Sequence, residues 1–194
     1  MVSREEMRKK LEGVLTAKRF VHSLNVMKTS MELAQKYGED KEKAAIAGLL
    51  HDCAREIRGE ELFNQCKKYH IHIDDIDRIQ PELLHGQLGV EIAREHYGVE
   101  DPAILKAIRY HTTGGRDMSL LDKIVFIADS IEPNRTFPGV EELRKTAFNQ
   151  MDHAVMMALD RTIKYVISKG ALIHPDTIEA RNYLILDKKN SIAK

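Results

Sequence analysis

The segment most informative about the architecture is residues 40–52, Asp-Lys-Glu-Lys-Ala-Ala-Ile-Ala-Gly-Leu-Leu-His-Asp. Its aspartate is suited to cap a helix N-terminus, because a carboxylate there accepts hydrogen bonds from free backbone N–H groups. Ala44, Ala47 and Gly48 recur at helical spacing, and His51 continues the same face. We therefore predict a helix that packs closely against a neighbour and ends in an imidazole and a carboxylate.

Apolar residues recur at a period of three to four in both directions from this helix, which is the mark of amphipathic helices. No window alternates long enough to predict a strand. The expected helices lie between Met7 and Leu15, from Phe20 to a stop at Gly38, from Pro102 to Gly114, from Ser119 to just before Pro133, from Val140 to Lys169 as one long helix, and from Thr177 to Leu186. The pattern predicts an all-α helical bundle.

Length and composition restrict the class of protein. The 194 residues suit a single domain spanning 1–194, and 43% hydrophobic residues suffice for a sizeable core. Thirty basic residues balance thirty acidic ones, so no overall field favours nucleic acid or an anionic membrane. The N-terminus is charged and no run of 18 apolar residues occurs, which predicts a cytoplasmic protein with neither a nucleic-acid nor a membrane partner.

Several histidines and aspartates end or interrupt the apolar stripes of different expected helices. They are His22, His51, Asp52, His85, His111 and Asp129. Any one histidine on an apolar face is more often a hydrogen-bonded core residue. Asp129, however, ends the run Lys-Ile-Val-Phe-Ile-Ala-Asp, where burying an unpaired carboxylate costs several kcal/mol. Imidazole and carboxylate groups converging in a helical bundle suit a divalent metal ion.

The ordered set resembles the four-part signature of the HD-domain metal-dependent phosphohydrolases, and the chain is most similar to their YqeK-type branch. The resemblance rests on Arg19-Phe-Val-His22, His51-Asp52-Cys-Ala-Arg55, His85-Gly86, Ile108-Arg-Tyr-His111-Thr112, Ala128-Asp129-Ser-Ile-Glu-Pro-Asn-Arg135 and Pro175-Asp176-Thr177. It implies an HD-domain helical bundle that hydrolyses diadenosine tetraphosphate symmetrically to two ADP. Iron is the metal it implies, although the ligand types also suit Mn, Co, Ni or Zn.

The resemblance assigns the first metal to His22, His51, Asp52 and Asp129. His85 and His111 either ligate a second metal bridged by Asp52 or bind substrate phosphate, and the sequence leaves both open. A metal ion lowers the pKa of a bound water, which would then attack an inner phosphorus. Asp52 and His111 are the expected catalytic residues, with His111 as general acid if it carries no metal.

Further residues are expected to bind the nucleotide, whether diadenosine tetraphosphate or an ADP or GDP product. Planar guanidinium groups suit phosphate, and the segment 172–177 is implied to close over the purine. The expected substrate-binding residues are Arg19, Arg55, Glu56, Ile57, Arg58, His85, His111, Thr112, Arg135, Leu172, Ile173, His174, Pro175, Asp176 and Thr177.

We place the metal-binding core at about residues 17–132, with C-terminal helices over 140–187 completing the bundle and the nucleotide pocket. Alternatives are an HD phosphatase or pyrophosphohydrolase for another nucleotide, a nucleotide-sensing protein without turnover, and a structural scaffold. The long C-terminal helix could pair with its copy in a homodimer.

Overall fold

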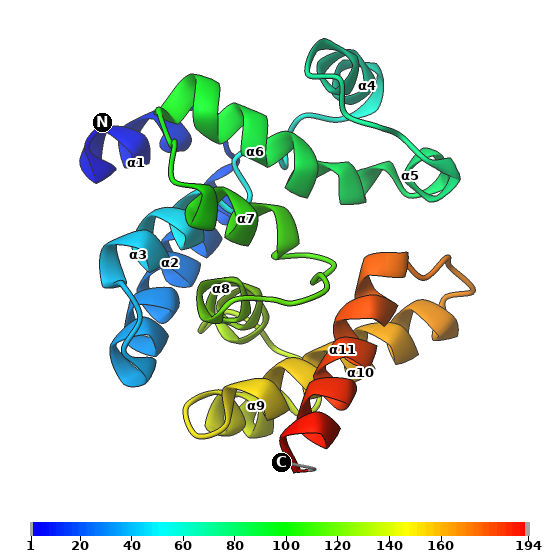
Figure 1. Ribbon diagram of the computed structural model, residues 1–194. Helices are drawn as coiled ribbons and strands as arrows, with labels where there is room; N and C mark the ends of the chain where they lie inside the picture. Colours follow the sequence, from blue (N-terminus) through cyan, green and yellow to red (C-terminus); the bar gives the residue numbers. More distant parts are fainter. Residues whose placement is uncertain (1, 193–194) are drawn as a thin grey trace.

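All regular secondary structure in residues 2–192, the part of the chain described by a computed structural model, is helical (Figure 1). The elements are α1 (Arg4–Glu12), α2 (Ala17–Tyr37), α3 (Lys41–Leu50), α4 (Gly59–Lys68), α5 (Asp75–Ile79), the short 3-10 helix η1 (Pro81–Leu83), α6 (Leu84–Tyr97), α7 (Pro102–Tyr110), α8 (Leu120–Ile131), α9 (Val140–Ala147), α10 (Met151–Ser168) and α11 (Pro175–Ile192). The all-α prediction is confirmed. Residue 1 and residues 193–194, the ends of the predicted 1–194 domain, lie outside the described residues.

Helix α8 lies between the N-terminal helices and the C-terminal ones (Figure 1). It packs against α2, α3 and α7 on one side and against α9 and α10 on the other, while α11 packs on α10. One hydrophobic core runs through these helices, from Met7 in α1 to Ala180 in α11. Within residues 2–192 no helix is long and apolar enough to cross a bilayer.

Helices α2 and α3 approach closely because α3 presents small residues to α2, as predicted. A Cβ atom on Gly48 would lie 2.7 Å from Ser30 Oγ and 3.0 Å from Met27 Cα. The Asp40 side chain caps α3 by accepting hydrogen bonds from the N–H groups of residues 42 and 43. The small-residue face thus brings the end of α3 next to α2.

The helix expected from Pro102 to Gly114 ends earlier, at Tyr110. His111 is its C-cap residue, as His51 is the C-cap of α3. Both imidazoles therefore stand at helix ends rather than on helix faces. This placement was predicted for His51 but not for His111, which was expected within a helix that runs to Gly114, and it allows each ring to bond a free carbonyl of the last turn.

The prediction of one long helix from Val140 to Lys169 is wrong, because the chain breaks between α9 and α10. In a continuous helix the Ala147 carbonyl would accept from the N–H of Met151. Instead it accepts a hydrogen bond of 2.6 Å from the Tyr37 hydroxyl, and Phe148 packs against the core. The last helix is also longer than the predicted 177–186, since it begins at Pro175 and runs to Ile192.

Replacing Tyr37 by phenylalanine tests this explanation of the break. The Ala147 carbonyl would lose its partner, and we expect the free energy of unfolding to fall by about 1 kcal/mol. Urea denaturation measures it, with Tyr165→Phe as control because that side chain is 57% exposed. Equal stability of the two variants would contradict the explanation.

Candidate active site

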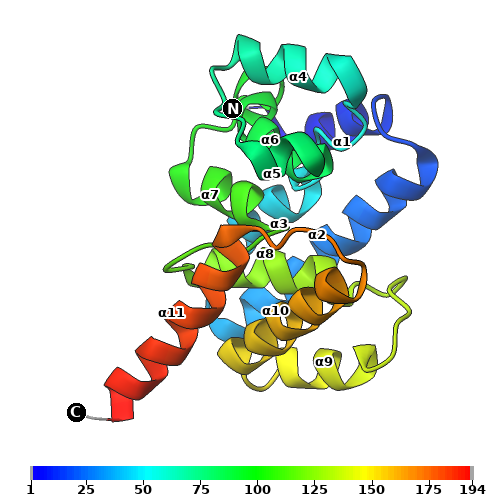
Figure 2. The same cartoon turned by 90° about the vertical axis from the view of Figure 1, so that its right-hand side faces the viewer.

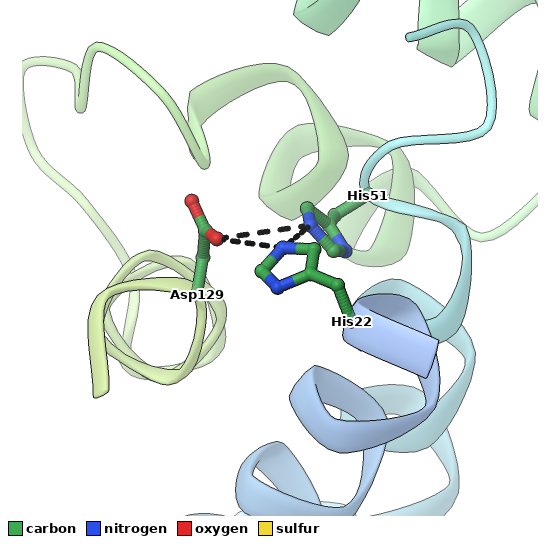
Figure 3. Close-up of side chains that lie close together, drawn as sticks. All are labelled: His22, His51 and Asp129. Atoms are coloured by element: carbon green, nitrogen blue, oxygen red, sulfur yellow. Dashed lines mark hydrogen bonds and ion pairs between the residues drawn. The ribbon is translucent and has the colours of Figure 1, made fainter. Parts of the chain in front are cut away.

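Three predicted ligands meet where α2, α3 and α8 converge. His22 stands on α2, His51 at the end of α3 and Asp129 near the end of α8, and their side chains point toward one another (Figure 3). His22 Nε2 lies 3.0 Å from Asp129 Oδ1 and 3.2 Å from His51 Nε2. His51 Nε2 lies 3.9 Å from the same Asp129 oxygen. The three donor atoms form a triangle small enough to hold one cation.

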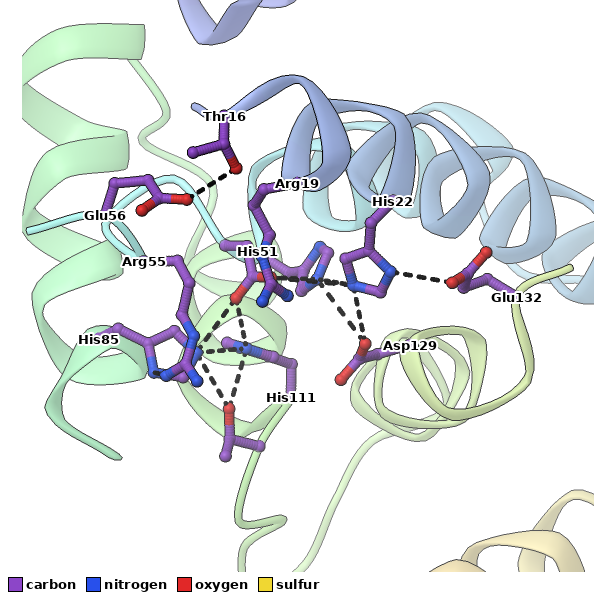
Figure 4. A network of polar contacts seen from close by, with 12 residues as sticks. Thr16, Arg19, His22, His51, Arg55, Glu56, His85, His111, Asp129 and Glu132 are labelled. Carbon is purple, nitrogen blue, oxygen red and sulfur yellow. Dashed lines mark hydrogen bonds and ion pairs between the residues drawn. The ribbon is translucent and has the colours of Figure 1, made fainter. Parts of the chain in front are cut away.

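Asp52 lies between two pairs of imidazoles. Its Oδ2 is 3.3 Å from His51 Nε2 and 3.7 Å from His22 Nε2. Its Oδ1 faces the other way, 3.2 Å from His85 Nε2 and 3.6 Å from His111 Nε2. Figure 4 shows His85 and His111 on one side of this network and His22 on the other. The six predicted histidines and aspartates thus come together, and Asp52 has one oxygen for each side.

Backbone carbonyls orient three of the four imidazoles. In each case Nδ1 donates to the carbonyl of the residue three positions earlier in the chain. The bonds run from His51 to Gly48 (2.7 Å), from His111 to Ile108 (2.7 Å) and from His85 to Glu82 (2.5 Å). A neutral imidazole carries one N–H, so these bonds leave Nε2 as a lone pair directed at Asp52.

Glu132, to which the sequence analysis assigned no role, orients the fourth imidazole. His22 Nδ1 donates to its Oε1 at 3.1 Å, and its Oε2 accepts from Asn25 Nδ2 (3.0 Å) and the Asn134 N–H (2.8 Å). Burial raises the pKa of Glu132, but these hydrogen bonds outweigh burial and lower it. A carboxylate that fixes a ligand histidine in this way is typical of metal sites. In the sequence, Glu132 stands directly after the apolar helix that carries Asp129 and inside the quoted motif from Ala128 to Arg135, but neither position indicated its role.

The electrostatics of the cluster fit a divalent cation. Four Nε2 lone pairs and two carboxylates face one another, an arrangement of acceptors that repel unless positive charge lies among them. Burial raises the pKa of Asp52 and of Asp129, yet hydrogen bonds and positive charge from neighbouring imidazoles that carry a proton, and from Arg135 for Asp129, keep both pKa values below the usual range. A bound cation would take the place of those protons. Burial also lowers the pKa of His85, which favours the neutral, ligating form. Imidazole nitrogen with carboxylate oxygen is the donor set for Fe, Mn, Co, Ni or Zn.

Three predicted arginines surround the cluster. Arg19, one turn before His22 on α2, donates to Asp52 Oδ2 at 2.8 Å. Arg135 pairs with the Asp129 carboxylate and also donates to the Asp129 carbonyl. Arg55 donates to the Glu82 carbonyl, which also holds His85. These three guanidinium groups, here called the arginine rim, border the cluster, and their planar geometry is suited to phosphate.

Thr112 also reaches the cluster, with Oγ1 2.9 Å from His111 Nε2 and 3.2 Å from His85 Nε2. Other predicted substrate residues are directed elsewhere. The Arg58 side chain is 68% exposed and pairs with Glu56, and Glu56 also accepts from Thr16. Ile57 packs against the core. The substrate-binding roles of residues 56–58 stay predictions.

The segment from Leu172 to Thr177 is part loop and part helix, since its last three residues form the first turn of α11. The N–H of Leu172 donates to Gln80 Oε1 at 2.7 Å, and this contact joins the segment to the α5–η1 connection. Thr177 is buried, whereas Leu172 is exposed. That the whole segment, including Ile173, His174, Pro175 and Asp176, closes over a purine stays a prediction.

Comparison with known proteins defines the class. The family model for the HD domain matches residues 19–134. This range includes all six clustered residues, from His22 to Asp129. The chain therefore belongs to the HD domain family.

Particular relatives cover nearly the whole chain. It is 42% identical to a protein named "Bis(5'-nucleosyl)-tetraphosphatase, symmetrical" from Halalkalibacterium halodurans, over 90% of this chain and 93% of that one. The protein of the same name from Bacillus subtilis is 38% identical, over 95% and 98% of the two chains. A crystal structure of a "predicted HD superfamily hydrolase involved in NAD metabolism" from Clostridium acetobutylicum superposes with a TM-score of 0.93 at 48% identity, covering 96% of this chain and 99% of that one.

Proposed function

We propose that this chain is a metal-dependent phosphoanhydride hydrolase that splits diadenosine tetraphosphate symmetrically into two ADP. The names of the relatives support this substrate. The observation that carries the chemistry is Asp52, whose two oxygens face two pairs of imidazoles. Hydrolysis of another nucleotide, or nucleotide sensing without turnover, is not favoured by these relatives.

His22, His51, Asp52 and Asp129 would hold the metal. A divalent ion there supplies an activated water and neutralises charge on the phosphoryl oxygens. We propose iron, following the resemblance, and leave two roles for His85 and His111: ligands of a second ion through Asp52 Oδ1, or donors to phosphate. The first role requires neutral rings, and the lowered pKa of His85 favours the neutral form of that ring.

Arg19 and Arg135 would hold the phosphate chain, because each guanidinium lies against a cluster carboxylate and has further N–H groups available for phosphate oxygens. If no second metal binds, His111 would act as an imidazolium with a proton on each ring nitrogen, and it would give the Nε2 proton to the ADP that leaves. Its Nδ1 is bonded to Ile108, so only Nε2 can face the substrate.

The decisive experiment combines metal analysis with product analysis. Protein purified without chelators, or supplied with Fe²⁺ or Mn²⁺, is expected to release ADP alone from diadenosine tetraphosphate. AMP with ATP, or free phosphate, would contradict symmetrical cleavage. Tight nucleotide binding without turnover under every metal would instead support a sensor.

Replacing Glu132 by glutamine tests its role in orienting His22. We expect metal affinity to fall about 10- to 100-fold, the range for partners that orient a ligand histidine, because the amide weakens the bond to Nδ1. Metal retention against graded chelator concentrations measures this without relying on activity. Glu141→Gln is the control, since the Glu141 side chain is 82% exposed. Equal retention by the two variants would count against the role.

The cytoplasmic location, the absence of nucleic-acid and membrane partners, the homodimer and the division into a core over about 17–132 with completing helices stay predictions from the sequence.

A further inference from the structure

A hollow of about 370 Å³ lies next to the arginine rim, between the α8–α9 connection, α9 and α10. Figure 2 shows that connection, in yellow-green, on the same side of the molecule as α10. Its lining includes Phe137, Glu142, Asp160, Arg161 and Lys164. None of them belongs to the cluster or to the predicted substrate-binding set.

Arg161 is the central side chain of this hollow. Its guanidinium carbon lies 3.5 Å from the centroid of the Phe137 ring, so the cation stacks on the aromatic face. Among residues 2–192 no carboxylate lies within ion-pair distance of Arg161, and neighbouring Asp160 is bonded to Arg181 at 2.5 Å. Lys164 adds a second cation one turn further along α10. The hollow therefore offers positive charge that no acid neutralises by direct contact.

The hollow lies near the cluster, as both the interaction between charged side chains and the path of the chain indicate. Burial and the charge of Arg135 both lower the pKa of Arg161, which means that the two guanidinium groups interact. Phe137 follows Arg135 by two residues, so their Cα atoms are at most about 7 Å apart, and Arg135 contacts Asp129. A phosphate chain held at Arg135 would therefore place its nucleoside end near Arg161.

We propose that this hollow binds the second nucleoside half of a dinucleoside polyphosphate, with the base stacked on the Arg161–Phe137 pair. This inference rests on the proposed function. A symmetrical cut needs the central anhydride at Asp52 and room for one nucleoside diphosphate on each side. The free face of a stacked guanidinium can stack on any nucleobase, because every base has a π-face. Glu142, which also lines the hollow, can accept hydrogen bonds from ribose hydroxyls.

Kinetics of Arg161→Ala test the proposal. We expect KM for diadenosine tetraphosphate to rise about tenfold, the loss typical of one base–side-chain stack, with kcat within about twofold because the lost contact is remote from the reacting phosphorus. The inhibition constant of adenosine 5'-tetraphosphate, which has the same phosphate chain but one nucleoside, is expected to stay within about twofold. Arg161→Lys keeps the charge and loses the planar stack, so it is expected to resemble Arg161→Ala for the dinucleotide.

Arg94→Ala is the matched control, because Arg94 is an exposed arginine on α6 paired with Glu91. Phe137→Leu is a second variant that removes the ring and leaves Arg161, and KM for the dinucleotide should again rise. An unchanged KM in Arg161→Ala, or an equal rise in KM and in the inhibition constant of the tetraphosphate, overturns the subsite.

Failure of the proposed function is distinguishable from failure of the subsite, because the wild type would then release no ADP. In that case ADP titration decides the subsite: two ADP per chain in the wild type and one in Arg161→Ala support it, and equal stoichiometry overturns it.

Discussion

Asp52→Asn should abolish both metal retention and hydrolysis while the protein stays folded. The substitution preserves the shape of the side chain but replaces one of its two carboxylate oxygens by an amide nitrogen. Each of these oxygens lies next to imidazole Nε2 atoms. The substitution also leaves Arg19 facing a neutral group. We expect kcat/KM to fall at least about a hundredfold, since even partners that only orient a ligand cost up to about a hundredfold.

Elemental analysis and release of ADP measure the two losses separately. Asp75→Asn is the control, because Asp75 is an exposed residue in the first turn of α5. A variant that kept its metal but lost activity would assign Asp52 to catalysis alone. A variant that kept both would remove the cluster from the mechanism and favour the scaffold alternative.

Gly48→Ala should destabilise the protein and weaken the metal site together. A new methyl group would lie 3.0 Å from Met27 Cα and 3.1 Å from the Val26 carbonyl, which are backbone atoms of α2 that cannot rotate away. Helix α3 must then move, and the Gly48 carbonyl that holds His51 moves with it. Alanine gains up to about 1 kcal/mol in helix propensity, but overpacking costs about 1–3 kcal/mol, so we expect net destabilisation.

Urea denaturation and metal retention measure the two effects of Gly48→Ala. Gly13→Ala is the matched control, since its Cβ would meet only the Lys10 carbonyl, at 3.5 Å. A more stable Gly48→Ala protein would show that α2 and α3 can separate without cost. It would also contradict the link between this contact and the position of His51.

Local signals predicted much of the fold. Ser119 and Asp122 form the capping box that begins α8, and Gly38 ends α2 in the left-handed conformation. Such signals act within one helical turn, so they are readable from neighbouring residues. The break after Ala147 was missed because the group that occupies the Ala147 carbonyl, the Tyr37 hydroxyl, is 110 residues away in the chain. A periodic apolar pattern is the same on both sides of such a break.

For the site, residue chemistry along the chain was enough to select the histidines and aspartates, because a carboxylate at the end of an apolar helix requires a cation or a donor. The sequence did not indicate which nitrogen of each ring faces inward, that Glu132 orients His22, or that Arg161 lies on Phe137. Those features depend on distances between segments far apart in the chain, and only packing of the helices sets such distances. By itself the sequence determined the helical class, most helices outside residues 59–97 and the ligand types. The tertiary structure decided where the chain breaks after Ala147, how each ligand is oriented and which cations lie beside the ligands.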